Sequence, residues 1–347
     1  MLPTPKDLPR IMCKPINMET MNAVVVEEYG NPNSVCAKEM PVPVPQEDFA
    51  LVKMEFAPIN VIDEITILGH HTQLPTPRIL GSEGSGTVVK SGGGQADSLV
   101  GKRVAVMAEY PGSSGTWAEY SVVHVSMIFP LSESTSFEQA ASFVVNPGTV
   151  ALFMQCIREG GYPSIIQNAA ASSLGKMLVR WCQKEGIQTV NLVRRREQVE
   201  ALKNIGAEHV LNTSEQGWVQ EASKLCNELD VRVGFDPVAG LSTNDLMTVI
   251  KEPGVVYNYG SLASQTCEVS AMLLIVQKKR LEGLCLPVWL AQLSPQEKER
   301  VSEEIEPLLP DVLKTDYSGE YNFSNIKDAL EAYKQKKTDS KFLIKIG

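Results

Sequence analysis

The stretch that decides the fold is SIIQNAAASSLGKMLVRWCQKEGIQTVNLVRRR, residues 164–196. Its first four residues are typical of a short buried strand, and a turn of small residues follows. An amphipathic helix with one buried face is then indicated by apolar residues at the i, i+3, i+4, i+7, i+8 spacing, namely Leu174, Met177, Leu178, Trp181 and Cys182. Gly186 stands where a C-terminal capping glycine is expected, and residues 189–193 predict a second strand. The stretch therefore predicts a strand–turn–helix–strand unit.

The turn is a degenerate form of the dinucleotide-binding fingerprint. In that fingerprint three glycines serve the turn, the close approach of pyrophosphate, and helix–strand packing. The matching positions here are Ala170, Ser172 and Gly175, so only the packing glycine is present. Small residues still allow a pyrophosphate to lie at the helix N-terminus, where N–H groups and the helix dipole favour an anion. Taken alone, the turn fits an ordinary strand-to-helix connection equally well.

The arginines after the second strand favour the nucleotide interpretation. An enzyme that uses NAD places an acidic residue there to hold the ribose 2′-hydroxyl, whereas arginine accommodates the 2′-phosphate of NADP. This chain has Arg194, Arg195 and Arg196, and Glu197 comes only afterwards. A solvated basic patch is the alternative, but three cations at a helix start oppose the helix dipole unless an anion is present. The sequence therefore predicts NADPH as the cofactor.

Length and composition narrow the class of protein. A chain of 347 residues can form two domains with sizeable cores. The net charge of −9 argues against a nucleic-acid or anionic-membrane partner. No apolar run is long enough to span a bilayer. Seven scattered cysteines without a C-x-x-C pair favour reduced thiols inside a cell. The Pro-rich first 20 residues predict a loosely docked tail, with a processed remnant of an organelle-targeting segment as the alternative.

The chain has two parts that differ in their predicted secondary structure. Residues 22–129 are β-rich, with strands expected at 23–26, 49–54, 86–89 and 103–106. After Pro147 strands and helices alternate, as in a parallel sheet covered on both faces. Residues 341–346 predict a terminal strand that rejoins the first part. We expect an α/β protein with a doubly wound parallel sheet and a β-rich second domain, and the cleft between them is the expected active site.

Short motifs spread along the chain carry a family resemblance. They are APINVID (57–63), LGSEGSG (80–86), VNPGT (145–149), IQNA (166–169), GAEHV (206–210), YG (259–260) and SK (340–341). With them the chain resembles the zinc-free medium-chain dehydrogenase/reductase superfamily, and within it the mitochondrial trans-2-enoyl-thioester reductases, with quinone oxidoreductases next. The resemblance implies a GroES-like catalytic domain from residues 1–145 and 311–347, and a Rossmann NADPH-binding domain from residues 146–310.

The resemblance also implies that zinc is absent. Zinc-binding members carry a G-H-E motif, and the matching residues here are Gly81, Ser82 and Glu83. Tetrahedral zinc needs several N or S ligands. Adjacent His70 and His71 are the remaining metal-binding possibility, but no partner pattern accompanies them.

For catalysis the resemblance implies that hydride reaches the β-carbon of an activated C=C bond and that a proton reaches the α-carbon. Enoyl reductases use a tyrosine in a G-x-Y segment, and the matching segment here, residues 69–71, ends in His71. Histidine can serve as a general acid near neutral pH, so His71 is a candidate catalytic residue, with a cleft-lining role as the equal alternative. Asn60 is the second candidate and would face the nicotinamide or the substrate carbonyl.

The implied cofactor contacts follow by matching positions. The pyrophosphate would meet Ala171, Ser172, Ser173 and Leu174, and the 2′-phosphate would meet the three arginines. The nicotinamide end would meet residues from three segments, namely Asn146, Thr149, Tyr259, Gly260, Ser261, Leu262, Leu284, Cys285 and Leu286, and Lys341 would reach the cofactor from the last strand. Core packing is the competing role for the apolar members.

The expected substrate is a small molecule or an acyl thioester of CoA or acyl-carrier protein. A quinone or enone reductase is the alternative, because histidine replaces the family tyrosine and Cys285 stands where enoyl reductases carry an aromatic residue. A non-catalytic NADPH-binding protein is the minority alternative. The resemblance further implies a homodimer, with which the apolar run 281–290 is compatible, and a mitochondrial location, with the cytoplasm as the alternative.

Overall fold

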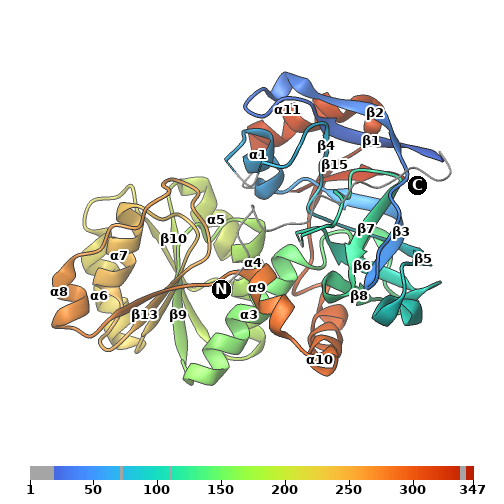
Figure 1. Cartoon of the computed structure of the whole chain (residues 1–347). Helices are drawn as coiled ribbons and strands as arrows, with labels where there is room; N and C mark the ends of the chain where they lie inside the picture. Colours follow the sequence, from blue (N-terminus) through green and yellow to red (C-terminus); the bar gives the residue numbers. More distant parts are fainter. Residues whose placement is uncertain (1–18, 71–72, 110, 337–340) are drawn as a thin grey trace.

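The computed structural model describes residues 19–70, 73–109, 111–336 and 341–347 (Figure 1). The expected N-terminal tail, apart from residues 19 and 20, lies outside this part of the chain, and so does His71. Among the described residues no helix is long and apolar enough to cross a membrane. The chain forms two lobes that lie side by side.

The first lobe is built on β-sheets. A three-stranded sheet has the order β2-β1-β4, and a seven-stranded sheet has the order β15-β16-β3-β5-β6-β8, with β7 paired to β3. The strands are β1 (Thr20–Val26), β2 (Val35–Pro41), β3 (Phe49–Pro58), β4 (Arg78–Ile79), β5 (Glu83–Ser91), β6 (Arg103–Met107), β7 (Tyr120–His124), β8 (Ile128–Pro130), β15 (Tyr317–Tyr321) and β16 (Lys341–Lys345). The helices are α1 (Val61–Ile67), α2 (Phe137–Ala140) and α11 (Ile326–Lys336), with 3₁₀ turns at Pro32–Ser34, Gly94–Leu99, Val125–Met127 and Phe323–Asn325.

The terminal strand rejoins this lobe as the sequence predicts. β16 pairs antiparallel with β3, so that Leu343 lies opposite Pro58 and Ile344 lies opposite Ala57. The expected strands at 23–26, 49–54, 86–89 and 103–106 are each present within a longer strand. The two ends of the chain therefore build one lobe, with the other lobe inserted between them.

The second lobe is a doubly wound parallel sheet. Its six strands have the order β11-β10-β9-β12-β13-β14. They are β9 (Ser164–Gln167), β10 (Gln188–Val193), β11 (His209–Asn212), β12 (Val233–Asp236), β13 (Val255–Asn258) and β14 (Arg280–Gly283). The helices are α3 (Val145–Gly160), α4 (Ser173–Lys184), α5 (Arg196–Lys203), α6 (Trp218–Glu228), α7 (Leu241–Val249), α8 (Ala271–Ile275), α9 (Leu286–Gln292) and α10 (Pro295–Ile305), and a 3₁₀ turn spans Glu306–Leu308. Figure 1 shows α6 and α7 on one face of the sheet and α3 and α4 on the other. The α/β class and the doubly wound sheet are confirmed.

The deciding stretch folds as expected. β9 and β10 pair in parallel with Ile166 opposite Val190, and α4 lies between them along the chain. Its apolar stripe is buried, since Met177, Leu178 and Cys182 have no exposed surface. The helix ends at Lys184, and Gly186 follows with φ of 71°, a left-handed conformation that glycine adopts without strain.

Helix α3 carries the core from one lobe into the other. A single cluster of buried side chains includes Val104 and Phe129 of the first lobe, Phe153 of α3, and Ile165 and Phe235 of the parallel sheet. The rings of Phe153 and Phe235 stack with centroids 4.3 Å apart. The position of α3 therefore couples the two lobes.

Gly175 provides a test of the close helix–strand contact. A Cβ atom at this position would lie 2.4 Å from the carbonyl oxygen of Ala170, which is backbone and cannot move aside cheaply. We expect Gly175→Ala to lower the free energy of unfolding by about 1–3 kcal/mol, although alanine favours the helix by about 1 kcal/mol. Urea unfolding checks this, with Gly283→Ala as the control because a Cβ there meets nothing within 4 Å. Equal stability of both variants would contradict the expectation.

Candidate active site

The turn between β9 and α4 consists of small residues, so a ligand could approach its backbone closely. Ala169 has φ of 47°, in the left-handed region, and Ala170 is fully buried. Ser172 is the N-cap of α4, and its hydroxyl accepts a hydrogen bond of 3.1 Å from the backbone N–H of Gly175. The first-turn N–H groups of a helix have no partner within the helix, so those of Ser173 and Leu174 are suited to bind an anion. Contact of residues 171–174 with a pyrophosphate stays a prediction.

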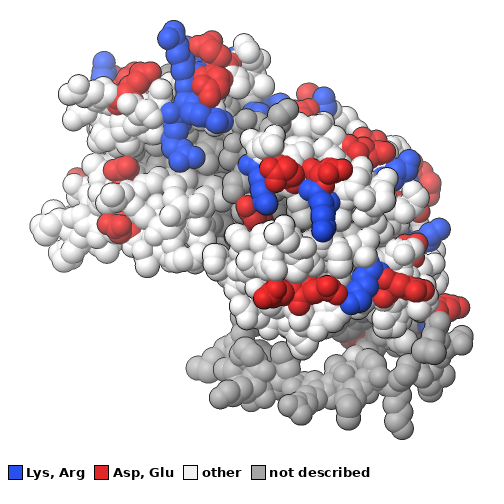
Figure 2. All heavy atoms as spheres, turned by 90° about the horizontal axis from the view of Figure 1, so that it is seen from above, with Lys and Arg blue, Asp and Glu red and all other residues white. Residues whose placement is uncertain are grey.

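The three arginines lie at the same edge of the sheet as this turn. β9 and β10 run in parallel, so their carboxyl ends meet at one edge, and all three arginine side chains are exposed there. Arg195 pairs with Glu197 at 3.1 Å, and the hydroxyl of Ser214 donates to the carbonyl oxygen of Arg194. Figure 2 shows Lys and Arg side chains gathered on one lobe beside the hollow between the lobes. The three arginines are therefore accessible to solvent at this edge of the sheet.

The sequence analysis did not single out Asp236, a buried carboxylate at the end of β12. The order of the strands reverses between β9 and β12. Asp236 ends β12 and has no exposed surface. It accepts hydrogen bonds from the side chains of Asn168 at 2.7 Å and Thr243 at 2.6 Å. The tie fixes the turn after β9 against the turn after β12. The signal in the sequence is an aspartate directly after the apolar strand residues 231–235.

The turns after β13 and β14 present further predicted cofactor residues at the same edge of the sheet. Tyr259 follows β13 and packs edge-on against Phe153 of α3, with ring centroids 4.7 Å apart. A Cβ at Gly260 would lie 2.9 Å from the carbonyl oxygen of Pro237. Ser261, Leu262 and Cys285 are exposed, Leu284 is half-buried and Leu286 is buried.

The N-terminal turns of α3 border the same place. Leu286 packs over Gly148, where a Cβ would lie 3.4 Å from a Leu286 methyl. Asn146 is half-buried, and the hydroxyl of Thr149 donates to the carbonyl oxygen of Val145 at 2.6 Å. The structure thus brings the predicted nicotinamide-end residues of α3, β13 and β14 to one edge, and their contact with a cofactor stays a prediction.

Asn60 and Lys341 lie in a buried polar cluster of the first lobe. The Lys341 ammonium donates to Asn60 Oδ1 at 2.7 Å and pairs with Glu83 Oε1 at 3.0 Å. Asn60 Nδ2 donates to Ser82 Oγ at 3.1 Å and to Glu83 Oε1 at 3.0 Å. Asn60 and Lys341 are each 6% exposed. Both side chains are therefore held by protein partners, and direct contact with substrate or cofactor stays a prediction.

Asp63 lies beside this cluster and is 3% exposed. Its Oδ2 accepts a hydrogen bond of 2.8 Å from the backbone N–H of Asn60 in a capping box at the start of α1. Burial raises the pKa of Asp63 to about 8, the hydrogen bonds from Asn60 and Ser82 oppose the shift, and the charges of Glu109 and Glu83 add to it. The carboxyl group is thus protonated at neutral pH.

The donor set at the matching G-H-E position does not fit zinc. Ser82 replaces the histidine ligand and accepts the hydrogen bond from Asn60. In the part of the chain that the structure describes, no group of three or more His, Cys, Asp or Glu side chains is placed to hold a metal ion. His70 is exposed, and its neighbour His71 lies outside the described residues, so the general-acid role of His71 stays a prediction.

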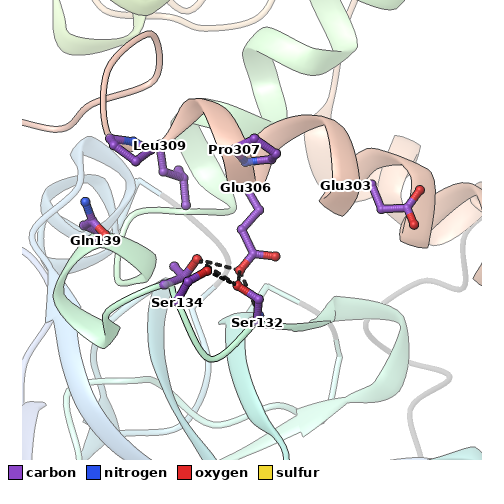
Figure 3. Close-up of a pocket in the computed structure, with 9 residues that line it drawn as sticks. Ser132, Ser134, Gln139, Glu303, Glu306, Pro307 and Leu309 are labelled. Carbon is purple, nitrogen blue, oxygen red and sulfur yellow. Dashed lines mark hydrogen bonds between the residues drawn. The ribbon is translucent and has the colours of Figure 1, made fainter.

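A cavity of about 490 Å³ marks a second joint between the lobes (Figure 3). There Glu306 accepts hydrogen bonds from Ser132 N at 2.8 Å, Ser132 Oγ at 2.6 Å and Thr135 Oγ1 at 2.5 Å. Figure 3 shows Glu306 directed toward Ser132 and Ser134. Among the residues that the structure describes, none of the predicted cofactor or catalytic residues lines this cavity.

Comparisons with known proteins agree with this geometry. Residues 46–133 match the family model "Alcohol dehydrogenase GroES-like domain", and residues 173–305 match "Zinc-binding dehydrogenase". The chain is 32% identical over 277 residues to a mitochondrial enoyl-[acyl-carrier-protein] reductase of Arabidopsis thaliana, covering 78% of this chain and 73% of the relative. The chain belongs to the medium-chain dehydrogenase/reductase superfamily.

Two further comparisons support the same family assignment. A mitochondrial enoyl-[acyl-carrier-protein] reductase of Caenorhabditis elegans is 29% identical over 282 residues, covering 78% of this chain and 79% of the relative. A putative NADPH:quinone reductase of Mesorhizobium loti superposes with a TM-score of 0.84 at 26% identity, covering 96% of this chain and all of that structure. The protein is therefore an oxidoreductase, and the family resemblance inferred from its motifs is confirmed.

Asp63 gives this site a measurable pH dependence. Between its ordinary pKa of 3.8 and about 8, the folded protein holds a proton that the unfolded chain has lost. The free energy of unfolding therefore falls as pH rises through this window. We expect Asp63→Asn, which keeps an acceptor for Asn60, to flatten that slope between pH 5 and 8 by up to about 1.4 kcal/mol per pH unit. Urea unfolding at several pH values measures the slope, and an unchanged slope would contradict the assignment.

Proposed function

We propose that this protein reduces the C=C bond of an α,β-unsaturated carbonyl compound with NADPH, and that the substrate is a trans-2-enoyl thioester of CoA or acyl-carrier protein. The observation that carries the cofactor choice is the exposed cluster Arg194, Arg195 and Arg196 at the carboxyl edge of the parallel sheet. Guanidinium groups bind phosphate with strong, bidentate hydrogen bonds. The names of the curated relatives, which are enoyl reductases, support the choice of substrate.

In this proposal the chain holds NADPH across the sheet edge. The first turn of α4 binds the pyrophosphate, and the arginines bind the 2′-phosphate. The turns after β13 and β14, together with Asn146 and Thr149 of α3, enclose the nicotinamide. Bound NADPH supplies the hydride for the β-carbon. His71 gives a proton to the α-carbon, and the polar cluster around Asn60 forms the wall of the first lobe.

A quinone or enone reductase is the second candidate. It is supported by the solved structure from Mesorhizobium loti, named as a putative NADPH:quinone reductase. The exposed Cys285, at a position where enoyl reductases carry an aromatic residue, also favours a different substrate. We further propose a homodimer and a mitochondrial location, the latter because the curated relatives are named mitochondrial.

A substrate panel separates the two candidates. We expect turnover of crotonyl-CoA and of a long-chain trans-2-enoyl-CoA with NADPH deuterated at C4, and deuterium at the β-carbon of the product by mass spectrometry, because hydride is delivered there. Reduction of a small quinone alone would assign the protein to the second candidate. Tight NADPH binding without turnover of any acceptor would indicate a non-catalytic protein.

The arginine cluster gives a test of cofactor choice. Arg194→Ala combined with Arg195→Ala removes donors to the 2′-phosphate, and hydrogen bonds to charged groups contribute about 1.5–3 kcal/mol each. We expect the Kd for NADPH to rise at least about tenfold while that for NADH stays within about threefold. Fluorescence titration measures both. The control is Lys203→Ala, at the C-terminal end of helix α5, which begins just after Arg195. Equal weakening of NADPH and NADH would reject the 2′-phosphate assignment.

A further inference from the structure

Glu83 is a fully buried carboxylate that bridges the two lobes. It begins β5 and has no exposed surface. Its Oε2 accepts hydrogen bonds from the backbone N–H groups of Val144 at 3.1 Å and Val145 at 2.8 Å, where α3 begins. Its Oε1 accepts from Lys341 and Asn60, each at 3.0 Å. One side chain thus joins β5, β16, the start of α1 and the start of α3.

Stability alone gives little reason for this arrangement. Burying a carboxylate and an ammonium group carries a large desolvation cost, and well-packed apolar residues often serve stability equally well. The four hydrogen bonds instead specify geometry, because their donors come from three separate segments of the chain and the carboxylate satisfies all of them. Two of those donors are first-turn N–H groups of α3, which need acceptors and which favour a negative charge.

The start of α3 borders the nicotinamide half of the sheet. In a doubly wound fold the two halves of the sheet each take one half of a dinucleotide. The arginines belong to the half that follows β9 and β10. The first turns of α3 contact Leu286 after β14, and Phe153 farther along α3 contacts Tyr259 after β13. A shift at the start of α3 would therefore disturb the nicotinamide end more directly than the arginines, which follow β10 in the other half of the sheet.

We propose that Glu83 is a positioning residue, which locks the start of α3 to the wall of the first lobe and thereby fixes the nicotinamide end of the cofactor site. Lys341 then acts through Glu83 and Asn60. This assignment rests on the proposed function for the identity of the cofactor.

The variant Glu83→Gln tests the lock. A glutamine has one acceptor oxygen and one donor NH₂ group. The buried Lys341 ammonium keeps the remaining oxygen, because an unpaired buried charge is costly, so the NH₂ would face the α3 N–H groups and break that side of the bridge. We expect the Kd for NADPH to rise at least about fivefold, while that for adenosine 2′,5′-bisphosphate, which lacks the nicotinamide half, stays within about twofold. The matched control is Glu27→Gln, which removes the exposed ion pair with Lys38, and no change is expected there.

The outcomes are distinct. The positioning role is overturned if neither Kd changes. It is also overturned if both Kd values rise by the same factor, because a purely structural defect would not distinguish the two ligands. Where Glu83→Gln alone does not fold, the double variant Glu83→Met with Lys341→Met removes both buried charges and leaves the α3 N–H groups without the carboxylate acceptor, so it carries the same expected difference. If the parent protein fails to bind NADPH, the proposed function itself is overturned.

Discussion

The reversal of strand order around β9 is the constraint on which the site depends. β9 pairs in parallel with β10 on one side and β12 on the other. All six strands therefore end at one edge, and the chain leaves β10 and β12 in opposite directions along the sheet. A crevice forms at such a point, and it takes ligands that span both halves. The turn after β9, the arginines and Asp236 gather there because of topology alone.

Buried hydrogen bonds convert this topology into a fixed geometry. Asp236 ties the turns after β9 and β12 together through Asn168. Inside the sheet, Gln167 Nε2 donates to Asn191 Oδ1 at 2.9 Å, which links β9 to β10. Between the lobes, Glu83 plays the corresponding part at the start of α3. Polar groups without access to water must find partners, so each of these contacts favours one relative placement of the elements it joins.

The sequence predicts what is local and misses what is distant. The helical spacing of the apolar residues 174–182 predicts α4, and the small residues after β9 predict the tight turn before it. The arginines are recognised because they follow the second strand of the unit, where a nucleotide ribose is expected. The Glu83–Lys341 pair joins residues 258 positions apart, and no periodicity reveals it. Motif matching predicts that Asn60 faces the nicotinamide or the substrate carbonyl, and it could not reveal that the fold provides partners for the Asn60 amide in Ser82, Glu83 and Lys341. Local pattern supplied the candidate residues, whereas the partners of their side chains required the tertiary structure.

The exposure of the three arginines is consistent with phosphate recognition. Guanidinium groups buried without an opposing charge would carry a heavy desolvation cost, so a cation cluster meant for a soluble anion is best kept hydrated at a rim. Arg195 already pairs with Glu197, which limits the local excess of positive charge. The helix α5 begins among these cations, and its N-terminal dipole opposes them. A phosphate would relieve both repulsions at once, whereas the ribose 2′-hydroxyl would relieve neither, and this difference is the physical basis on which we propose NADPH rather than NADH.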